Sequence, residues 1–249
     1  MEGINKKKVD LLGIPVDAIT MEDTIQIINN AIHSKLRISH VGINAWTVVA
    51  IQKDEDLQKS VTSCDLISAD GQSIVWACRF LGHPIPERVP AIEIMGNLID
   101  HAAQKGHKVF FFGAREEVVQ KVAQIYSGKF GNEVIAGFRN GYFQEDEEPG
   151  IARQIGESGA HILFLAMPSP QKENFIFNHQ KLLTGINYNL GVGGAFDVVA
   201  GVTKRAPGWM QKNGLEWFYR FIQEPHRMWK RYFIGNFRFM FLIFREKLK

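Results

Sequence analysis

Short, mostly apolar segments alternate with segments of helical periodicity along most of this chain. The apolar segments are predicted strands at residues 9–14, 38–43, 66–68, 108–112, 134–137, 161–166 and 186–190. Helical periodicity is found at residues 21–33, 45–60, 72–80, 92–105, 116–126, 151–158 and 170–183. Strands that are apolar throughout are typical of parallel sheets buried between two layers of helices. The sequence therefore predicts an α/β fold with a Rossmann-like, mostly parallel sheet that carries helices on both faces.

Polar or glycine residues follow several of the predicted strands. They are Asn44, Asp70, Gly113, Ser169 and Gly191. In parallel sheets, ligands bind beyond the carboxyl ends of the strands. We therefore expect these residues to converge on one crevice.

A glycine turn follows the last predicted strand. Gly191, Gly193 and Gly194 allow the backbone to turn tightly and to approach a ligand closely. A helix is predicted at residues 195–200, and its N-terminal amides would favour a phosphate. The GxGG spacing is shorter than a dinucleotide-binding fingerprint, so an ordinary strand-to-helix turn is the alternative.

Five side chains near these strand ends are candidates for chemistry or binding, and each has a plainer alternative. Asp70 could deprotonate an attacking hydroxyl, or cap the next helix. Asn44 could bind a substrate hydroxyl, or cap a helix, and Arg88 could pair with a phosphate, or be solvated. Tyr142 could stack on a flat ring, or cover the edge of the core. Asp197 could accept a hydrogen bond from a base or ribose, or complement a helix dipole.

The last fifth of the chain is basic and aromatic. Residues 204–249 hold 11 Lys and Arg against 3 Asp and Glu, a formal charge of +8, so residues 1–203 carry −5 of the total of +3. Pro225 and Gly235 are expected to divide this tail into shorter helices. The spacing of four and seven residues predicts one helical stripe of Arg227, Arg231, Arg238 and Arg245. Such a tail suits an anionic membrane surface, single-stranded nucleic acid, or a packed helix with a solvated basic face, and we favour the membrane.

The remaining composition limits the class of protein. No apolar run reaches the ~20 residues that span a bilayer, and the N-terminus lacks an apolar signal-peptide core. We therefore expect a cytoplasmic protein, peripheral on the inner face of the membrane. Cys64 and Cys78 are expected to be free thiols. The histidines form no metal motif, and the acidic run 54–56 is expected to be a solvated helix face, so no metal and no cofactor are predicted.

Several motifs resemble those of the WecG/TagA/CpsF family of bacterial glycosyltransferases. In chain order they are Ala69-Asp70-Gly71, Phe112-Gly113, Gly141-Tyr142-Phe143, Gly191-Val192-Gly193-Gly194-Ala195-Phe196-Asp197, Ala200-Gly201, Lys204-Arg205-Ala206-Pro207, Gly214-Leu215-Glu216-Trp217, Arg220, Glu224-Pro225, Arg227 and Lys230-Arg231-Tyr232. The likeness covers nearly the whole chain, and its C-terminal part is highly specific.

This resemblance implies an inverting, metal-independent enzyme. It would move N-acetylmannosamine, its uronic acid or a related hexose from a UDP-sugar to a polyprenyl-diphosphate-linked sugar during synthesis of a cell-surface polysaccharide. The resemblance makes Asp70 the base, and Asn44 and Arg88 pocket residues. It places Tyr142 and Asp197 near the uridine. The resemblance also implies that residues 1–203 form the catalytic domain and that residues 204–249 dock on the membrane and complete the site.

Further residues are carried over from the same resemblance. The tail arginines Arg220, Arg227 and Arg231 are expected to reach the diphosphates, and the glycines of the turn to border the donor. Gly113, Gln171 and Lys172 complete the substrate-binding set. Apolar helix surface could also serve self-association into a homo-oligomer, whereas no nucleic-acid partner is expected.

The chain departs from the family pattern at four positions. Gly42 stands where threonine is usual, Ala91 and Glu93 stand where glycine and aspartate are usual, and Lys172 occupies the usual glutamine position beside Gln171. These positions surround the expected sugar pocket, so they bear on the donor sugar or the acceptor.

Two other classes of function are compatible with the residues alone. One is a nucleotide-dependent oxidoreductase, against which the absence of GxGxxG after the first strand argues. The other is a non-enzymatic module that binds a membrane or nucleic acid through the tail.

Overall fold

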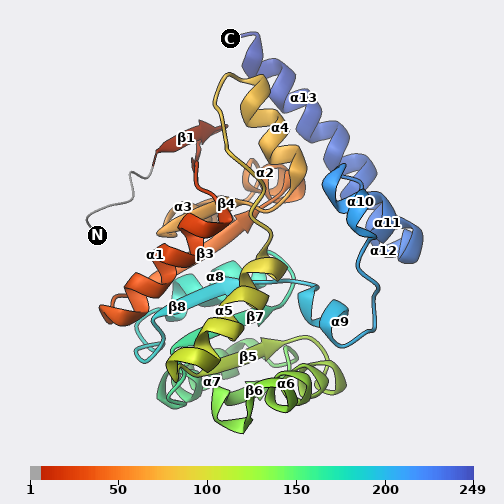
Figure 1. Ribbon diagram of the computed structural model, residues 1–249. Helices are drawn as coiled ribbons and strands as arrows, with labels where there is room; N and C mark the ends of the chain where they lie inside the picture. Colours follow the sequence, from red (N-terminus) through yellow and green to blue (C-terminus); the bar gives the residue numbers. More distant parts are fainter. Residues whose placement is uncertain (1–6) are drawn as a thin grey trace.

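Six strands form one sheet in a computed structural model that describes residues 7–249 (Figure 1). All the pairings in this sheet are parallel, as the sequence predicts. In spatial order the strands are β4 (Leu66–Ala69), β3 (Ile38–Ile43), β8 (Tyr188–Gly191), β7 (Ile162–Ala166), β5 (Val109–Gly113) and β6 (Ile135–Arg139). The chain crosses from one half of the sheet to the other between β4 and β5, so the strand ends beside this crossover can form a crevice.

An antiparallel hairpin precedes the sheet. Its strands are β1 (Lys8–Leu11) and β2 (Ile14–Asp17), so the prediction of a single strand over residues 9–14 is wrong. The chain reverses at Leu12 and Gly13, whose φ angles are 57° and 83°. Two successive positive φ angles are typical of the tight turns that match the twist of a hairpin.

One face of the sheet is covered by four helices. They are α1 (Met21–His33), α5 (Ala91–Lys105), α6 (Glu116–Phe130) and α9 (Ala195–Val199). Phe111, Phe164 and Leu190 point toward this layer, because alternate side chains of a strand face opposite sides of the sheet. The side chains on this face of the sheet and those of the four helices form the largest of the three buried apolar clusters.

The opposite face is covered in two parts. Over β3 and β4 lie the hairpin, α2 (Ala45–Ile51), α3 (Glu55–Thr62) and α4 (Gln72–Phe80). The buried side chains Phe239 and Ile243, from the end of the chain, belong to the same cluster. Over β5 and β7 lie α7 (Glu148–Glu157) and α8 (Gln171–His179). The predicted α/β architecture is therefore confirmed, with helices on both faces.

The acidic run at residues 54–56 interrupts the helix predicted over residues 45–60. Asp54 is the N-cap of α3 and accepts a hydrogen bond from the amide of Leu57 at 2.9 Å. Glu55 and Asp56 are exposed in the first turn, as expected for a solvated face. The cap explains the break, because a capping aspartate has extended backbone and cannot continue the preceding helix.

The basic-aromatic tail folds into helices that return to the sheet. They are α10 (Gly208–Lys212), α11 (Glu216–Gln223), α12 (Pro225–Trp229), the π-helical turn η3 (Lys230–Ile234) and α13 (Gly235–Lys247). Pro225 begins α12, as predicted. The break predicted at Gly235 is wrong, because this residue is helical, with φ −64° and ψ −50°. A Cβ there would lie 2.9 Å from the ring of Trp46, so glycine permits α13 to approach α2.

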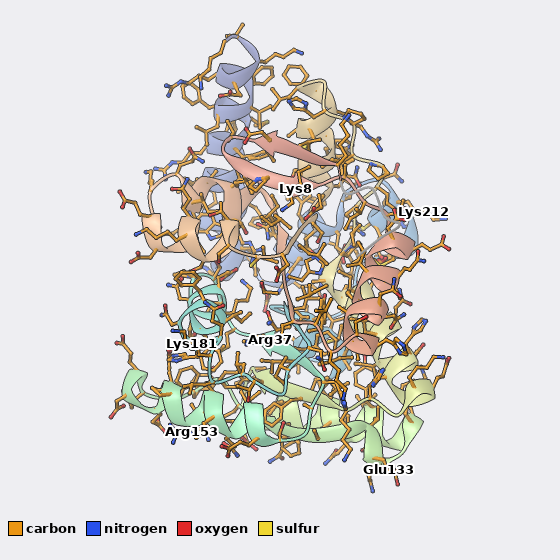
Figure 2. All side chains as sticks on the ribbon, turned by 90° about the vertical axis from the view of Figure 1, so that its left-hand side faces the viewer. Lys8, Arg37, Glu133, Arg153, Lys181 and Lys212 are labelled. Atoms are coloured by element: carbon orange, nitrogen blue, oxygen red, sulfur yellow. The ribbon has the colours of Figure 1, made fainter. Side chains whose placement is uncertain are left out.

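The remaining described elements are two 3-10 turns, η1 (Asn132–Val134) and η2 (Glu145–Glu147). Charged side chains lie on the outside of the molecule, as Figure 2 shows for Lys8, Arg37, Glu133, Arg153, Lys181 and Lys212. Among the helices of residues 7–249, none combines the length and the apolar character needed to cross a bilayer.

Candidate active site

A large cleft opens at the carboxyl ends of β3, β4, β7 and β8. Asn44, Asp70, Ser169 and Gly191 line it together, so the predicted crevice is confirmed for these four residues. Its volume is about 1680 Å³. Pockets for small molecules usually measure about 300–1,000 Å³, so this cleft has room for two substrates side by side.

Asp70 projects into the cleft from the end of β4. Its Oδ1 accepts a hydrogen bond from the amide of Ala91 at 2.8 Å. Asp70 does not cap the next helix, α4, whose N-cap is Gly71 without a side-chain cap, but the amide it accepts from belongs to the first residue of α5. A Cβ on Gly42 would lie 3.0 Å from the Cβ of Asp70, so the departure at Gly42 leaves the carboxylate room beside β3.

Burial raises the pKa of Asp70 above its ordinary value. The Ala91 amide and the nearby guanidinium of Arg88 oppose this rise, and the Glu216 carboxylate adds to it. A carboxylate whose pKa is raised by burial is a stronger base than a solvated aspartate. Asp70 therefore has the position and the electrostatic setting of a general base.

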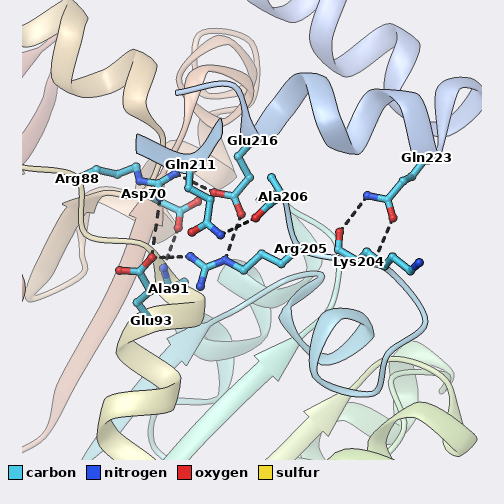
Figure 3. A network of polar contacts seen from close by, with 10 residues as sticks. All are labelled: Asp70, Arg88, Ala91, Glu93, Lys204, Arg205, Ala206, Gln211, Glu216 and Gln223. Atoms are coloured by element: carbon cyan, nitrogen blue, oxygen red, sulfur yellow. Dashed lines mark hydrogen bonds and ion pairs between the residues drawn. The ribbon is translucent and has the colours of Figure 1, made fainter. Parts of the chain in front are cut away.

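Arg88 belongs to a network of four charges that joins the tail to the core (Figure 3). Its Nη1 donates to Oε2 of Glu216 at 2.9 Å, and its Nη2 lies 3.9 Å from Oε1 of Glu93. Arg205 donates to the same two carboxylates. Arg88 is therefore not the solvated arginine of the alternative reading, because ion pairs hold it at the edge of the cleft.

This network explains one departure from the family pattern. Glu93 reaches Arg205 in the segment between α9 and α10 and also comes near Arg88. Gln223, at the end of α11, adds two hydrogen bonds to the backbone of Lys204, at 3.0 and 2.9 Å (Figure 3). The Arg88–Glu216 and Glu93–Arg205 pairs thus fasten the tail to the edge of the cleft, and Gln223 joins two parts of the tail to each other.

The glycine turn is filled by two cationic side chains. The aliphatic part of Lys172 lies against Gly191, where a Cβ would come within 2.7 Å of Cδ and Cε. A Cβ on Gly194 would clash with the guanidinium of Arg220. At these two positions the missing Cβ leaves room for the cationic side chains, whereas Gly193 has a φ of 52°.

Lys172 is itself paired. Its ammonium contacts the buried carboxylate of its neighbour Glu173. The helix predicted at residues 195–200 is a single turn, α9, so its dipole adds little to anion binding. The Lys172 charge is offset by Glu173, so positive charge at the turn comes mainly from the Arg220 side chain.

The other candidate residues lie around the same cleft, with one exception. Asn44 is the N-cap of α2, as its alternative predicts, and also lines the cleft. Tyr142 is 70 % exposed, so it does not cover the core, and Asp197 faces the cleft from α9. Gln171 lines the cleft as well. Gly113 does not: its φ is 123° and it lies against the backbone of Ala166, so close strand packing explains the glycine.

The tail arginines do not form the predicted single stripe. Arg220 and Arg231 line the cleft, whereas Arg238 and Arg245 are exposed on α13 away from it. Arg231 lies in the π-helical turn η3, which changes the helical register by one residue before α13 begins. Arg227 lies in α12, and its side chain is outside the part of the chain that the structure describes.

Residues 7–249 contain no group of three or more His, Cys, Asp and Glu side chains placed to hold a metal ion. The chemistry that this geometry offers is proton abstraction by Asp70 beside cationic groups that favour a diphosphate. Sequence reasoning missed Glu93 and Glu216 as partners of Arg88, and Arg205 as the second arginine that pairs with both carboxylates. Their charges alone could not predict these ion pairs, because the pairs form only where the tail folds back against the residues around Arg88 and Glu93.

Residues 9–249 match the glycosyl transferase WecG/TagA/CpsF family. A similar protein is the N-acetylglucosaminyldiphosphoundecaprenol N-acetyl-beta-D-mannosaminyltransferase of Bacillus subtilis (strain 168). It is 34% identical over 76% of this chain and 72% of its own length. The protein of the same description from Staphylococcus aureus (strain MW2) is 30% identical over 100% of this chain and 96% of its own.

Proposed function

Because the chain belongs to the WecG/TagA/CpsF family of glycosyl transferases, we propose that it transfers a sugar from a UDP-sugar to a polyprenyl-diphosphate-linked acceptor. The names of the relatives support N-acetylmannosamine as the sugar and a diphosphoundecaprenol-linked N-acetylglucosamine as the acceptor. The observation that carries the proposal is Asp70 at the end of β4, in one cleft with the glycine turn and the tail arginines.

In the proposed reaction, the acceptor hydroxyl gives its proton to Asp70. Its oxygen attacks the anomeric carbon of the donor from the face opposite UDP, and a new C–O bond forms with inversion. The bond to the β-phosphate oxygen breaks, and its electron pair leaves with UDP.

The leaving diphosphate carries negative charge that must be stabilised. Arg220 lies on the glycine turn and Arg231 lines the same cleft, so both are placed to donate charge-assisted hydrogen bonds. We include Arg227 in this set from the family pattern. With cations from the tail, the reaction needs no metal ion.

We assign the donor's nucleoside to the part of the cleft that Tyr142 and Asp197 line, beside the glycine turn. Exposed Tyr142 offers a ring for stacking on uracil, and Asp197 offers acceptor oxygens for ribose or base. Asn44, Arg88, Gln171 and Lys172 would surround the sugars. Because Arg88 is held by Glu93 and Glu216, it would orient a substrate from a fixed position.

The same proposal divides the chain into a catalytic domain, residues 1–203, and a tail, residues 204–249, that docks on the inner face of the membrane. Exposed aromatic side chains and exposed Arg238 and Arg245 on α13 support this docking.

The test is a turnover assay with UDP-N-acetylmannosamine and a short-chain prenyl-diphosphate-linked N-acetylglucosamine. We expect release of UDP that is unchanged by EDTA. Calorimetry should show binding of UDP and not of NAD. Binding of NAD would favour an oxidoreductase, and membrane binding without turnover of any UDP-sugar would favour a non-enzymatic module.

A further inference from the structure

The cleft continues beyond Asp70 as a groove between α4 and α13, which lie side by side in Figure 1. Ala77, Phe239 and Ile243 form its floor and are buried. Side chains on both helices form its walls and are exposed: Trp76, Phe80, Met240 and Phe244. We refer to these seven residues as the α4–α13 groove.

The two ends of this continuous cavity differ in chemistry. The catalytic end holds the guanidinium groups of Arg88, Arg220 and Arg231, whereas the α4–α13 groove is lined by apolar side chains. A ligand that matches both ends has an anionic head and a hydrocarbon chain. A peptide would match the groove less well, because its backbone N–H and C=O groups would find few partners on apolar walls.

The groove also has a definite length. Along α4 the cleft is lined from Ser73 to Phe80, a rise of about 10 Å at 1.5 Å per residue, and the groove itself takes the last part, from Trp76 to Phe80, a rise of about 6 Å. At its far end the rings of Phe80 and Phe244 meet edge to face, with centroids 5.5 Å apart. The Lys247 ammonium lies 5.6 Å from the Phe80 ring, so the surroundings become charged beyond this point.

We propose that the α4–α13 groove binds the first isoprene units of the acceptor's polyprenyl chain, an inference that rests on the proposed function. The diphosphate would lie near the tail arginines, and the chain would run along the groove and leave it at Phe80 and Phe244. The enzyme would then recognise the lipid as well as the sugar of its acceptor, and only the first isoprene units would contribute to affinity.

Calorimetry without membranes tests this inference with inorganic diphosphate, geranyl, farnesyl and geranylgeranyl diphosphate as ligands, each below the concentration at which it forms micelles. Burial of one methylene strengthens binding about fourfold. We therefore expect at least a tenfold gain in affinity from geranyl to farnesyl diphosphate. The next unit should add little, because the groove ends.

A matched pair of variants separates the groove from apolar surface in general. Met240→Trp fills the groove and should remove the dependence on chain length while leaving the affinity for inorganic diphosphate unchanged. Phe241→Trp changes the next residue of α13, which is 67 % exposed and does not line the cleft, and should behave as wild type. Trp76→Ala removes a wall on α4 and should weaken only the prenylated ligands.

Equal affinity for all four ligands would contradict prenyl binding in the α4–α13 groove. Equal behaviour of Met240→Trp and Phe241→Trp would contradict it as well. The proposed function fails separately. If chain-dependent binding is found but no UDP-sugar is turned over, the groove stands and the transferase assignment falls. If turnover is found with the same KM for acceptors of every prenyl length, the transferase stands and the groove falls.

Discussion

At the scale of single residues, Asp70 meets two opposing demands. Its carboxylate is held by one backbone amide, that of Ala91, and is otherwise turned toward the cleft. A second strong donor would lower its basicity, whereas no donor would leave its orientation free. This hydrogen bond, the one that Asp70 accepts among the described residues, fixes the direction of Oδ1, and we expect the other oxygen to take the substrate proton.

Asp70→Asn should abolish most turnover without unfolding the protein. The amide oxygen can still accept from Ala91, but it cannot take a proton, so we expect kcat to fall by about 10²–10⁴. Rate measurements with saturating substrates, beside a thermal melt and UDP calorimetry, check this. Near-wild-type turnover would remove Asp70 from the role of base.

The pH dependence gives a second prediction about the same residue. Only ionised Asp70 can act as base, so kcat/KM should fall tenfold per pH unit as the pH drops below its pKa, which burial raises above the ordinary aspartate value. Arg88 lowers this pKa and Glu216 raises it. Arg88→Gln should therefore move the fall of kcat/KM at low pH, the acid limb of the profile, to higher pH. Glu216→Gln should move it to lower pH.

The direction of these two shifts is the measurement, since both variants are also expected to lower the rate. An acid limb that stays in place in both variants would show that another group titrates.

Sequence alone could place Asp70 and Asn44, because each directly follows an apolar strand and strand ends converge in a parallel sheet. It could not decide between capping and catalysis. Asn44 does cap α2, with its Oδ1 accepting from Trp46 and Thr47. Asp70 accepts instead from Ala91, 21 residues later, and no local spacing encodes that contact.

At the scale of elements, α11 is attached to the core mainly through Glu216. This residue lies at the start of the helix and accepts from both Arg88 and Arg205. α11 has no buried residue among its eight, and its Trp217 and Phe221 rings pack on Tyr232 and Phe233 of the tail, not on the sheet. Its placement therefore depends on charge more than that of any helix against the sheet.

Glu216→Gln should loosen α10 and α11 while leaving the sheet unchanged. The ion pairs are partly exposed, so each contributes about 1 kcal/mol or less. We expect amide hydrogen exchange in these helices to quicken about fivefold. Glu246→Gln is the matched control, because its ion pair with Lys249 lies at the end of the tail. Equal exchange in α11 of wild type and Glu216→Gln would contradict this role.

The strands and most helices were predictable because their burial repeats regularly. The misses concern local backbone geometry. Leu12 has a positive φ in the hairpin turn although it is not glycine, and a π-helical turn stands where Gly235 suggested a break. The second depends on a tertiary contact, the fit of Gly235 against Trp46, that composition does not reveal.

At the scale of the whole molecule, charge is distributed unevenly. Residues 204–249 carry +8 and residues 1–203 carry −5. The side chains of α13 that face away from the sheet include exposed Phe237 and Phe241 beside exposed Arg238 and Arg245. Basic groups beside aromatic rings suit the headgroup region of an anionic bilayer.

Replacing Arg238 and Arg245 together by Gln should weaken binding to anionic vesicles. Each basic residue near such a surface contributes about 1 kcal/mol, so a loss of about 30-fold is expected at low salt and a smaller one at high salt. Vesicle sedimentation measures it. Arg153→Gln with Lys181→Gln removes the same charge from α7 and the segment after α8, and should have little effect. An equal loss in both double variants would point to net charge instead of the tail.

Phe239 and Ile243 complete the apolar cluster that also contains Val48 and Ile74. On the ribosome these two side chains emerge after every strand of the sheet has been made. The nascent protein therefore presents an unfilled apolar surface beside α2 and α4 until residue 243 has left the ribosome. Folding of this half of the molecule finishes late, and a mutation that slows synthesis of the last helices would prolong the period in which a chaperone must shield it.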